Sequence, residues 1–86
     1  MHYKITVKGN VQGVFFRAST KEKADELDLS GFVQNETNGD VYLEAQGDRV
    51  EELIAWIQAG GPKMARVDEA IITEGKGQMF IGFKIR

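Results

Sequence analysis

The spacing of apolar residues alternates along this chain between the period of a β-strand and that of an α-helix, and this alternation constrains the fold most. Apolar residues occupy every second position in residues 3–7, whereas apolar or small residues recur at steps of four, four and three in residues 16–27. The first pattern predicts a half-buried strand and the second predicts one face of a helix. Residues 9–13, bounded by two glycines, are expected to break the strand, and Gly31 is expected to form the left-handed C-terminal cap of the helix.

A hairpin is predicted after the first helix. Two strand-like runs, residues 32–35 and 41–45, flank the pair Asn38-Gly39. An Asn-Gly pair between two such runs favours a tight turn, because both residues tolerate positive φ.

A second helix and further strands are predicted in the rest of the chain. Asp48, followed three residues later by Glu51, is typical of a capping box at a helix start. Residues 60–62, Gly-Gly-Pro, are expected to end this helix, and residues 67–73 and 79–85 have the pattern of strands. The apolar face of the second helix is predicted from residues at positions i, i+3, i+4 and i+7: Val50, Leu53, Ile54 and Ile57.

The order of elements is therefore β-α-β-β-α-β, with a possible extra strand at the C-terminus. This order predicts an α+β fold, a ferredoxin-like βαββαβ sandwich in which an antiparallel sheet has both helices on one face. We expect residues 1–86 to form a single domain whose other sheet face is left largely to solvent. The helix-covered face is expected to bury Phe16, Leu27, Leu53, Ile54 and Ile57.

The composition excludes several kinds of functional site. The 86 residues include no cysteine and one histidine, so a disulfide, a thiol nucleophile and a cysteine zinc site are excluded. A formal charge of −2 argues against broad binding to nucleic acid or anionic membranes. No apolar run approaches the ~20 residues of a membrane span, and the chain starts as a strand, so we expect a cytoplasmic protein. His2, at the terminus, is expected to have no partner.

The connection between the first strand and the first helix, residues 8–17, has the features of an anion site. Gly9 and Gly13 allow a sharp turn and let a ligand approach the main chain. The helix start offers unpaired N–H groups, and Arg17 can bind two oxygens of a phosphoryl group. The segment is not a nucleotide P-loop, because Val14 follows the second glycine. An ordinary turn followed by a solvated arginine would explain the same residues without a function.

Two segments of the chain resemble the signatures of the acylphosphatase family. They are residues 9–17, GNVQGVFFR, and residues 31–41, GFVQNETNGDV. The length, the element order and the break at residues 60–62 also fit, so the resemblance covers nearly the whole chain. Two positions depart from the family: Asn10 stands where a basic residue is frequent, and Asn38 stands where aspartate is common.

The resemblance implies a hydrolase that cleaves the carboxyl–phosphate bond of acyl phosphates, without a metal or cofactor, and gives a carboxylate and inorganic phosphate. In that family the strand-to-helix loop cradles the substrate phosphate, its last arginine binds the phosphate, and an asparagine of the second segment positions the attacking water. By position, the catalytic residues are expected to be Arg17 and Asn35. The expected phosphate-binding residues are consecutive: Gln12, Gly13, Val14, Phe15, Phe16 and Arg17.

Two other interpretations stay open. One is a non-catalytic module that binds an anion or phosphate, and the other is an RNA-binding module with aromatic side chains on the open sheet face. Tyr42 is the clear candidate for such an aromatic residue. For the enzyme we expect a monomer whose partners are an acyl phosphate substrate and inorganic phosphate as product and inhibitor, with no nucleic acid or membrane. Lys84 and Arg86 are expected to protect one sheet edge.

Overall fold

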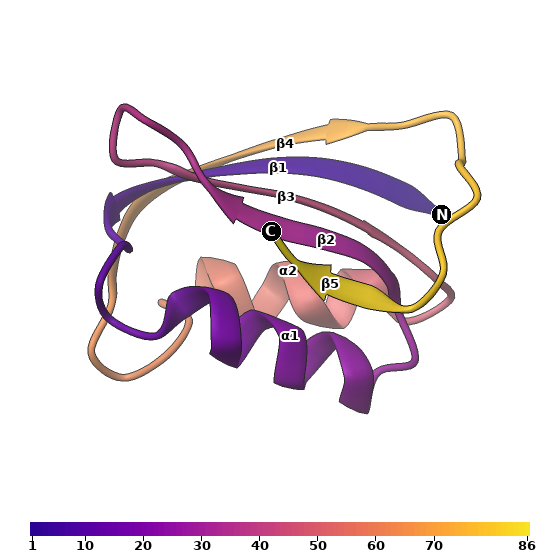
Figure 1. The fold of residues 1–86 in the computed structure, drawn as a ribbon, viewed down its shortest axis with the longest axis horizontal. Helices are drawn as coiled ribbons and strands as arrows, with labels where there is room; N and C mark the ends of the chain where they lie inside the picture. Colours follow the sequence, from indigo (N-terminus) through magenta and orange to yellow (C-terminus); the bar gives the residue numbers. More distant parts are fainter.

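The computed structural model, which describes residues 1–86, has the predicted order of strands and helices and one additional strand at the end. Both helices lie against the same face of the sheet, as Figure 1 shows. Neither helix is long and apolar enough to cross a membrane. The elements are, in chain order, β1 (His2–Asn10), α1 (Phe16–Glu26), β2 (Ser30–Asn35), β3 (Val41–Gln46), α2 (Val50–Gln58), β4 (Arg66–Glu74) and β5 (Phe83–Ile85).

The strands form one sheet in the order β4-β1-β3-β2-β5. The pairs β1–β3, β1–β4 and β2–β3 are antiparallel, as predicted, but β5 pairs with β2 in parallel. The sheet is therefore mixed, and the prediction of a purely antiparallel sheet is wrong at this edge. The chain reverses direction after β4 and crosses to the opposite edge (Figure 1), so β5 runs antiparallel to β4 and parallel to β2.

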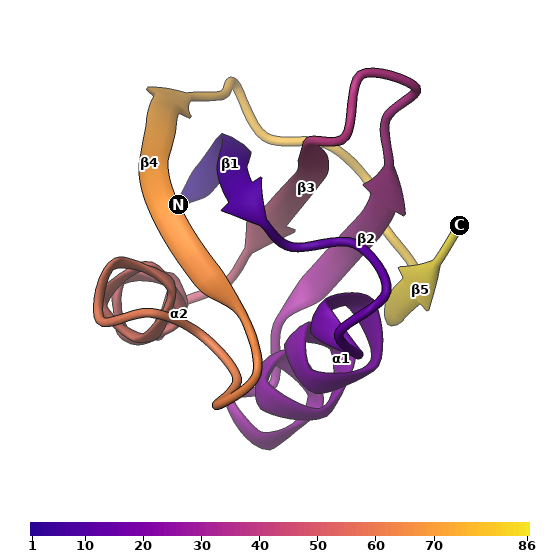
Figure 2. The ribbon, with the colours of Figure 1, turned by 90° about the vertical axis from the view of Figure 1, so that its left-hand side faces the viewer.

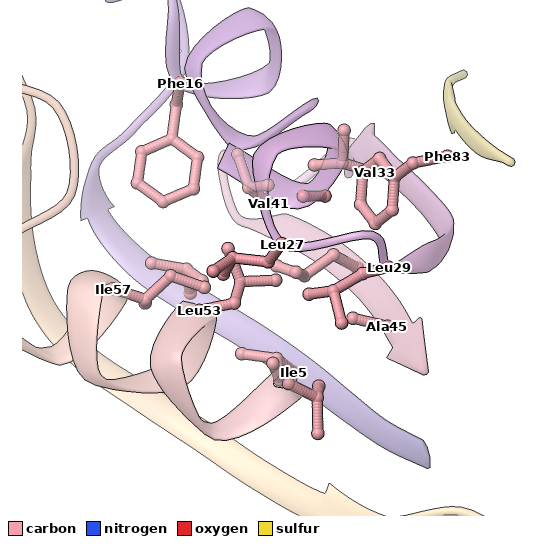
Figure 3. Packing of buried hydrophobic residues seen from close by; sticks show 14 of the residues in the cluster. Ile5, Phe16, Leu27, Leu29, Val33, Val41, Ala45, Leu53, Ile57 and Phe83 are labelled. Atoms are coloured by element: carbon pink, nitrogen blue, oxygen red, sulfur yellow. The ribbon is translucent and has the colours of Figure 1, made fainter. Parts of the chain in front are cut away.

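The core fills the space between the helices and the sheet. Four of the five residues predicted for the helix-covered face are buried, and the fifth, Ile54, is partly buried against them. Figure 3 shows Phe16 and Leu27 from the α1 region facing Leu53 and Ile57 of α2, above the strand that contains Ile5. The α+β sandwich with two helices on one face is thus confirmed.

The segment before β5 differs from its prediction. The sequence predicts a strand over residues 79–85, but the strand covers only Phe83–Ile85, and the side chains of Met79 and Ile81 are exposed. Phe80 faces the sheet instead, with its ring 6.2 Å from that of Phe32. Gly82, with φ 65°, separates this segment from β5, so the alternation of residues 79 and 81 does not continue that of the strand.

The C-terminal cap of α1 also differs from its prediction. Asp28, with φ 56°, has the left-handed conformation after Leu27, and Gly31 lies three residues further along, in β2. A Cβ at Gly31 would collide with the main-chain oxygen of Glu44. Gly31 is therefore needed for the close approach of β2 and β3, and an aspartate ends the helix.

The capping box predicted at the start of α2 is absent. The helix begins at Val50 with Arg49 at its N-cap, and no side chain caps it. Arg49 pairs instead with Glu52, with 2.8 Å between Nε and Oε2. Asp48 and Glu51 therefore do not have the roles that the sequence pattern predicted.

Candidate active site

β1 extends past the point where the sequence predicted a break. It continues through Gly9 to Asn10, and the register of its pairing with β4 shifts between Lys8 and Gly9. A Cβ at Gly9 would collide with the main-chain oxygen of Arg66. Gly9 therefore lets the last part of β1 stay paired with β4, and the loop proper is shorter than the sequence predicted.

The loop between β1 and α1 turns through two left-handed residues. Gly13 has φ 76° and Phe15, the N-cap of α1, has φ 62°. Phe15 is 75% exposed as a residue, whereas Phe16 is buried in the core, as expected. No side chain caps the start of α1, so the first N–H groups of the helix have no acceptor from the N-cap side chain. Such groups, at the positive end of the helix dipole, favour an anion.

Arg17 lies in the first turn of α1, beside these N–H groups. Its Nη1 donates a hydrogen bond to the main-chain oxygen of Arg86, at 2.9 Å. No Asp or Glu side chain forms an ion pair with Arg17. The other N–H donors of its guanidinium are therefore available to an anion.

The end of β2 brings Asn35 to the same end of the sheet as Arg17. The main-chain N–H of Arg86 donates to Val33, two residues before Asn35, while the oxygen of Arg86 accepts from Arg17. Asn35 pairs with Val41, a core residue, so by strand alternation its side chain is on the helix-covered face. The side chain of Asn35 is exposed. Arg17 and Asn35 thus share one end and one face of the sheet.

The side chain of Gln12 joins the loop to the β2–β3 hairpin. Its Nε2 donates to the main-chain oxygens of Glu36 and Asp40, both at 2.8 Å. Lys8 adds a second link, with Nζ 2.8 Å from Oδ2 of Asp40, and this hydrogen bond raises the pKa of Lys8. Figure 2, which views this end of the molecule, shows the loop passing between the end of β1 and the start of α1. These links hold the segment next to Asn35 against the loop.

The hairpin itself has a different turn from the one predicted. Gly39 has a positive φ of 97°, but Asn38 does not. Asn38 accepts a hydrogen bond at Oδ1 from the main-chain N–H of Asp40, at 3.0 Å. Gln34 donates from Nε2 to Oε2 of Glu36, at 3.2 Å, on the face of the sheet opposite to Asn35.

His2 is not the unpartnered residue that the sequence predicted. Its ring is buried; Nε2 lies 2.8 Å from Oε1 of Glu44, and Nδ1 accepts from the N–H of Gly77. Tyr42 donates to the other oxygen of Glu44, at 2.7 Å. Burial and this hydrogen bond raise the pKa of Tyr42 to about 12. Burial alone would raise the pKa of Glu44, but the hydrogen bonds from Tyr42 and His2 outweigh it and lower the pKa.

The pocket of the molecule lies away from the candidate site. A cavity of about 490 Å³ is lined by residues at the start of β1, the end of β3 and the turn after β4, and none of the predicted site residues lines it. No group of three or more His, Asp or Glu side chains is arranged to hold a metal ion. The candidate anion site is thus a surface cradle of main-chain groups and one guanidinium.

Two contributions to this site were missed by the sequence reasoning. The side chain of Gln12 was expected only as part of a main-chain cradle, and Arg86 only as protection for a sheet edge. Gln12 donates to main-chain oxygens that are 24 and 28 positions further along the chain. Arg17 donates to the main-chain oxygen of Arg86, 69 positions further along. No local pattern marks such contacts.

Comparison with known proteins relates the whole chain to one family. A sequence model described as Acylphosphatase matches residues 3–85. A protein named Acylphosphatase from Rhizorhabdus wittichii is 48% identical over 82 residues, covering 93% of this chain and 82% of that protein. One of the same name from Aeropyrum pernix is 47% identical, covering 96% of this chain and 85% of that protein. The solved structure of an acylphosphatase from Coxiella burnetii has a TM-score of 0.93 at 40% identity, covering 99% of this chain and 90% of that one.

Proposed function

Because the chain belongs to the acylphosphatase family, whose enzymes hydrolyse acyl phosphates, we propose that residues 12–17 bind the phosphoryl group and that Asn35 orients the attacking water. The observation that carries this proposal is the convergence of Arg17 and Asn35. They lie at one end and on one face of the sheet, beside a loop whose N–H groups have no side-chain cap.

In the proposed mechanism the enzyme works mainly by positioning and by neutralising charge. Main-chain N–H groups of residues 12–16 and the guanidinium of Arg17 bind the phosphoryl oxygens. The amide of Asn35 holds a water molecule in line with the bond from phosphorus to the acyl oxygen. The water oxygen attacks phosphorus, that bond breaks, and the water proton passes to a phosphoryl oxygen. The carboxylate is a good leaving group, so the reaction needs little acid assistance.

We further propose that hydrolysis requires no metal ion. Phosphoryl-transfer enzymes commonly use a metal to neutralise charge on the transferring group. Here Arg17, which has no Asp or Glu partner, and the start of α1 supply positive charge at the same place. The prediction is that a chelator leaves the activity unchanged.

The open sheet face gives less support to an RNA-binding module. Tyr42 donates its hydroxyl to Glu44 and packs on Phe32, with 5.9 Å between ring centroids. Phe32 itself is buried beneath Phe80 and Arg86. Stacking of bases needs exposed rings without adjacent carboxylates, and this face does not offer them.

A single domain, a monomeric state and a cytoplasmic location stay predictions.

The proposal is tested by hydrolysis of an aryl acyl phosphate such as benzoyl phosphate, followed by the change in ultraviolet absorbance with and without EDTA. We expect rapid hydrolysis that EDTA does not reduce and that inorganic phosphate inhibits competitively. A non-catalytic phosphate-binding module would bind phosphate without turnover, and an RNA-binding module would do neither. Hydrolysis that stops with EDTA would contradict the metal-independent mechanism.

A further inference from the structure

Arg86 makes contacts on both sides of the end of β2. Its guanidinium lies over the ring of Phe32, with Cζ 3.7 Å from the ring centroid, on the open face of the sheet. Its main-chain N–H donates to the oxygen of Val33, at 2.8 Å, and its main-chain oxygen accepts from Arg17, at 2.9 Å. The residue that is stacked on the open face is thus the one that holds the guanidinium of the candidate active site.

Phe32 is itself held firmly. It is 7% exposed, and its ring lies against those of Tyr42 and Phe80, with centroid distances of 5.9 Å and 6.2 Å. Aromatic neighbours at these distances favour particular relative orientations of the rings. Phe32 therefore presents a fixed aromatic surface to Arg86.

We infer that Phe32 is a positioning residue for Arg17, acting through Arg86. β5 has three residues, and short terminal segments held by few hydrogen bonds open readily. The stacking of the Arg86 guanidinium on Phe32 adds an attraction that keeps the main-chain oxygen of Arg86 in place. That oxygen orients the guanidinium of Arg17 before substrate arrives, so less freedom is lost on binding. The inference rests on the proposed role of Arg17 in phosphate binding.

The stacking places an aromatic cluster outside the active site in control of phosphate affinity. The face of the sheet opposite to the helices is not part of the proposed phosphate site, yet its rings determine where Arg86 lies. Loss of the stacking is expected to weaken phosphate binding more than the chemical step, because Arg17 remains present but is less well oriented.

The test compares Arg86→Ala with Lys84→Ala in the hydrolysis assay. Both variants remove one positive charge from the C-terminal segment, and both side chains are exposed, but only Arg86 stacks on Phe32. We expect Arg86→Ala to raise both KM and the inhibition constant of inorganic phosphate about three- to tenfold, with a smaller change in kcat. Lys84→Ala should change both constants less than twofold. Equal effects of the two variants would reduce the role of Arg86 to its charge and overturn the inference.

Phe32→Leu and the double variant separate positioning from general structure. If Phe32 acts through Arg86, Phe32→Leu raises the phosphate inhibition constant to the same extent, and the double variant is no worse than either single one. Additive effects would contradict the inference. If Phe32→Leu fails to fold, as judged by circular dichroism, the comparison of Arg86→Ala with Lys84→Ala still decides whether the stacked side chain of Arg86 affects phosphate binding.

The same assay on Arg17→Ala distinguishes the inference from the proposed function. If Arg17→Ala leaves phosphate inhibition unchanged, the proposed role of Arg17 is wrong and the inference falls with it. If Arg17→Ala abolishes phosphate inhibition while Arg86→Ala changes nothing, the proposed function stands and the inference alone is wrong.

Discussion

The side-chain nitrogen of Gln12 lies 2.8 Å from the main-chain oxygen of Asp40, and so connects the proposed phosphate loop to the hairpin that follows Asn35. The same nitrogen donates to Glu36, the residue next to Asn35. The amide side chain of Gln12 therefore helps to set the distance between the proposed phosphate site and the water that Asn35 is proposed to hold. These side-chain hydrogen bonds of Gln12 are separate from the main-chain contacts that the loop is proposed to make with the substrate.

Replacement of Gln12 tests this connection. Gln12→Leu keeps the side chain's bulk but removes both hydrogen bonds, so the free energy of unfolding should fall by about 1 kcal/mol. Because the two halves of the site lose their alignment, kcat/KM should fall about tenfold to a hundredfold. Urea denaturation and the hydrolysis assay measure the two effects. Full activity in a folded Gln12→Leu protein would show that the hairpin is positioned by other contacts.

Asn35→Ala is expected to remove the orientation of water without affecting the phosphate cradle. The turnover number should fall on the order of 10²–10³-fold, as when one preorganised hydrogen-bonding group is deleted. Inhibition by inorganic phosphate should stay close to that of the unmodified protein. Asn38→Ala, in the exposed turn three residues further on, is the control and should retain nearly full turnover. If both variants are equally active, the role proposed for Asn35 is wrong.

Arg17 is expected to contribute mainly to phosphate binding. Arg17→Ala should raise KM and weaken phosphate inhibition, because no other cationic side chain lies in the first turn of α1. Arg17→Lys keeps the charge but loses the planar, two-donor geometry, so its KM should lie between those of the unmodified protein and Arg17→Ala. Initial rates at several phosphate concentrations give these constants. An Arg17→Lys protein with unchanged phosphate inhibition would show that charge alone is sufficient.

The parts of the fold that depend on local patterns were predictable from the sequence. The positions of Phe16, Leu53 and Ile57 in the core follow from helical spacing, and all three are buried. The order of the first six elements follows in the same way. A helix or strand with one apolar face has few ways to bury it, so periodicity determines both the element and its orientation.

The parts that depend on distant contacts were not predictable. Met79 and Ile81 continue the two-residue spacing of Phe83 and Ile85, as strand residues do. Yet it is Phe80 that faces the sheet, because it packs on Phe32 and His2, which are distant in sequence. His2 is buried because the turn after β4 lies over it, with Gly77 donating to its ring. The periodicity of one segment does not show which distant segment will pack over it and bury its side chains.

The candidate site also contains both kinds of feature, those predictable from a local sequence pattern and those that depend on distant contacts. Arg17 and Asn35 were named because their surrounding segments resemble a family signature, and the structure brings both to one end of the sheet. The side-chain bonds of Gln12 and the stacking of Arg86 on Phe32 needed the tertiary structure. Residue roles that act through main-chain oxygens leave no side-chain pattern in the sequence.

The left-handed residue after α1 gives a stability prediction. Asp28 has φ 56°, which glycine adopts at lower cost, so Asp28→Gly should stabilise the protein by about 0.5–1 kcal/mol. Gly31→Ala, three residues later, should be strongly destabilising, because the new Cβ would collide with the main chain of Glu44. Thermal unfolding of the two variants should therefore shift in opposite directions. A loss of stability in Asp28→Gly would indicate that the aspartate side chain contributes more than its backbone costs.

Tyr42 gives a prediction for alkaline pH. Burial and the hydrogen bond to Glu44 raise its pKa from 10.0 to about 12, so the folded protein keeps the phenol protonated where the unfolded chain loses the proton. The stability that Tyr42 contributes is therefore fully present below pH 10 and is lost as the pH rises from 10 toward 12.

Tyr42→Phe removes this ionisation and is the matched control, since other groups titrate equally in both proteins. The difference in unfolding free energy between the unmodified protein and Tyr42→Phe should be constant from pH 7 to pH 9. It should then shift in favour of Tyr42→Phe between pH 10 and 12. Urea denaturation at a series of pH values measures the difference. A difference that stays constant to pH 12 would mean that Tyr42 ionises as readily in the folded protein as in the unfolded chain, and that its bond to Glu44 is not maintained in solution.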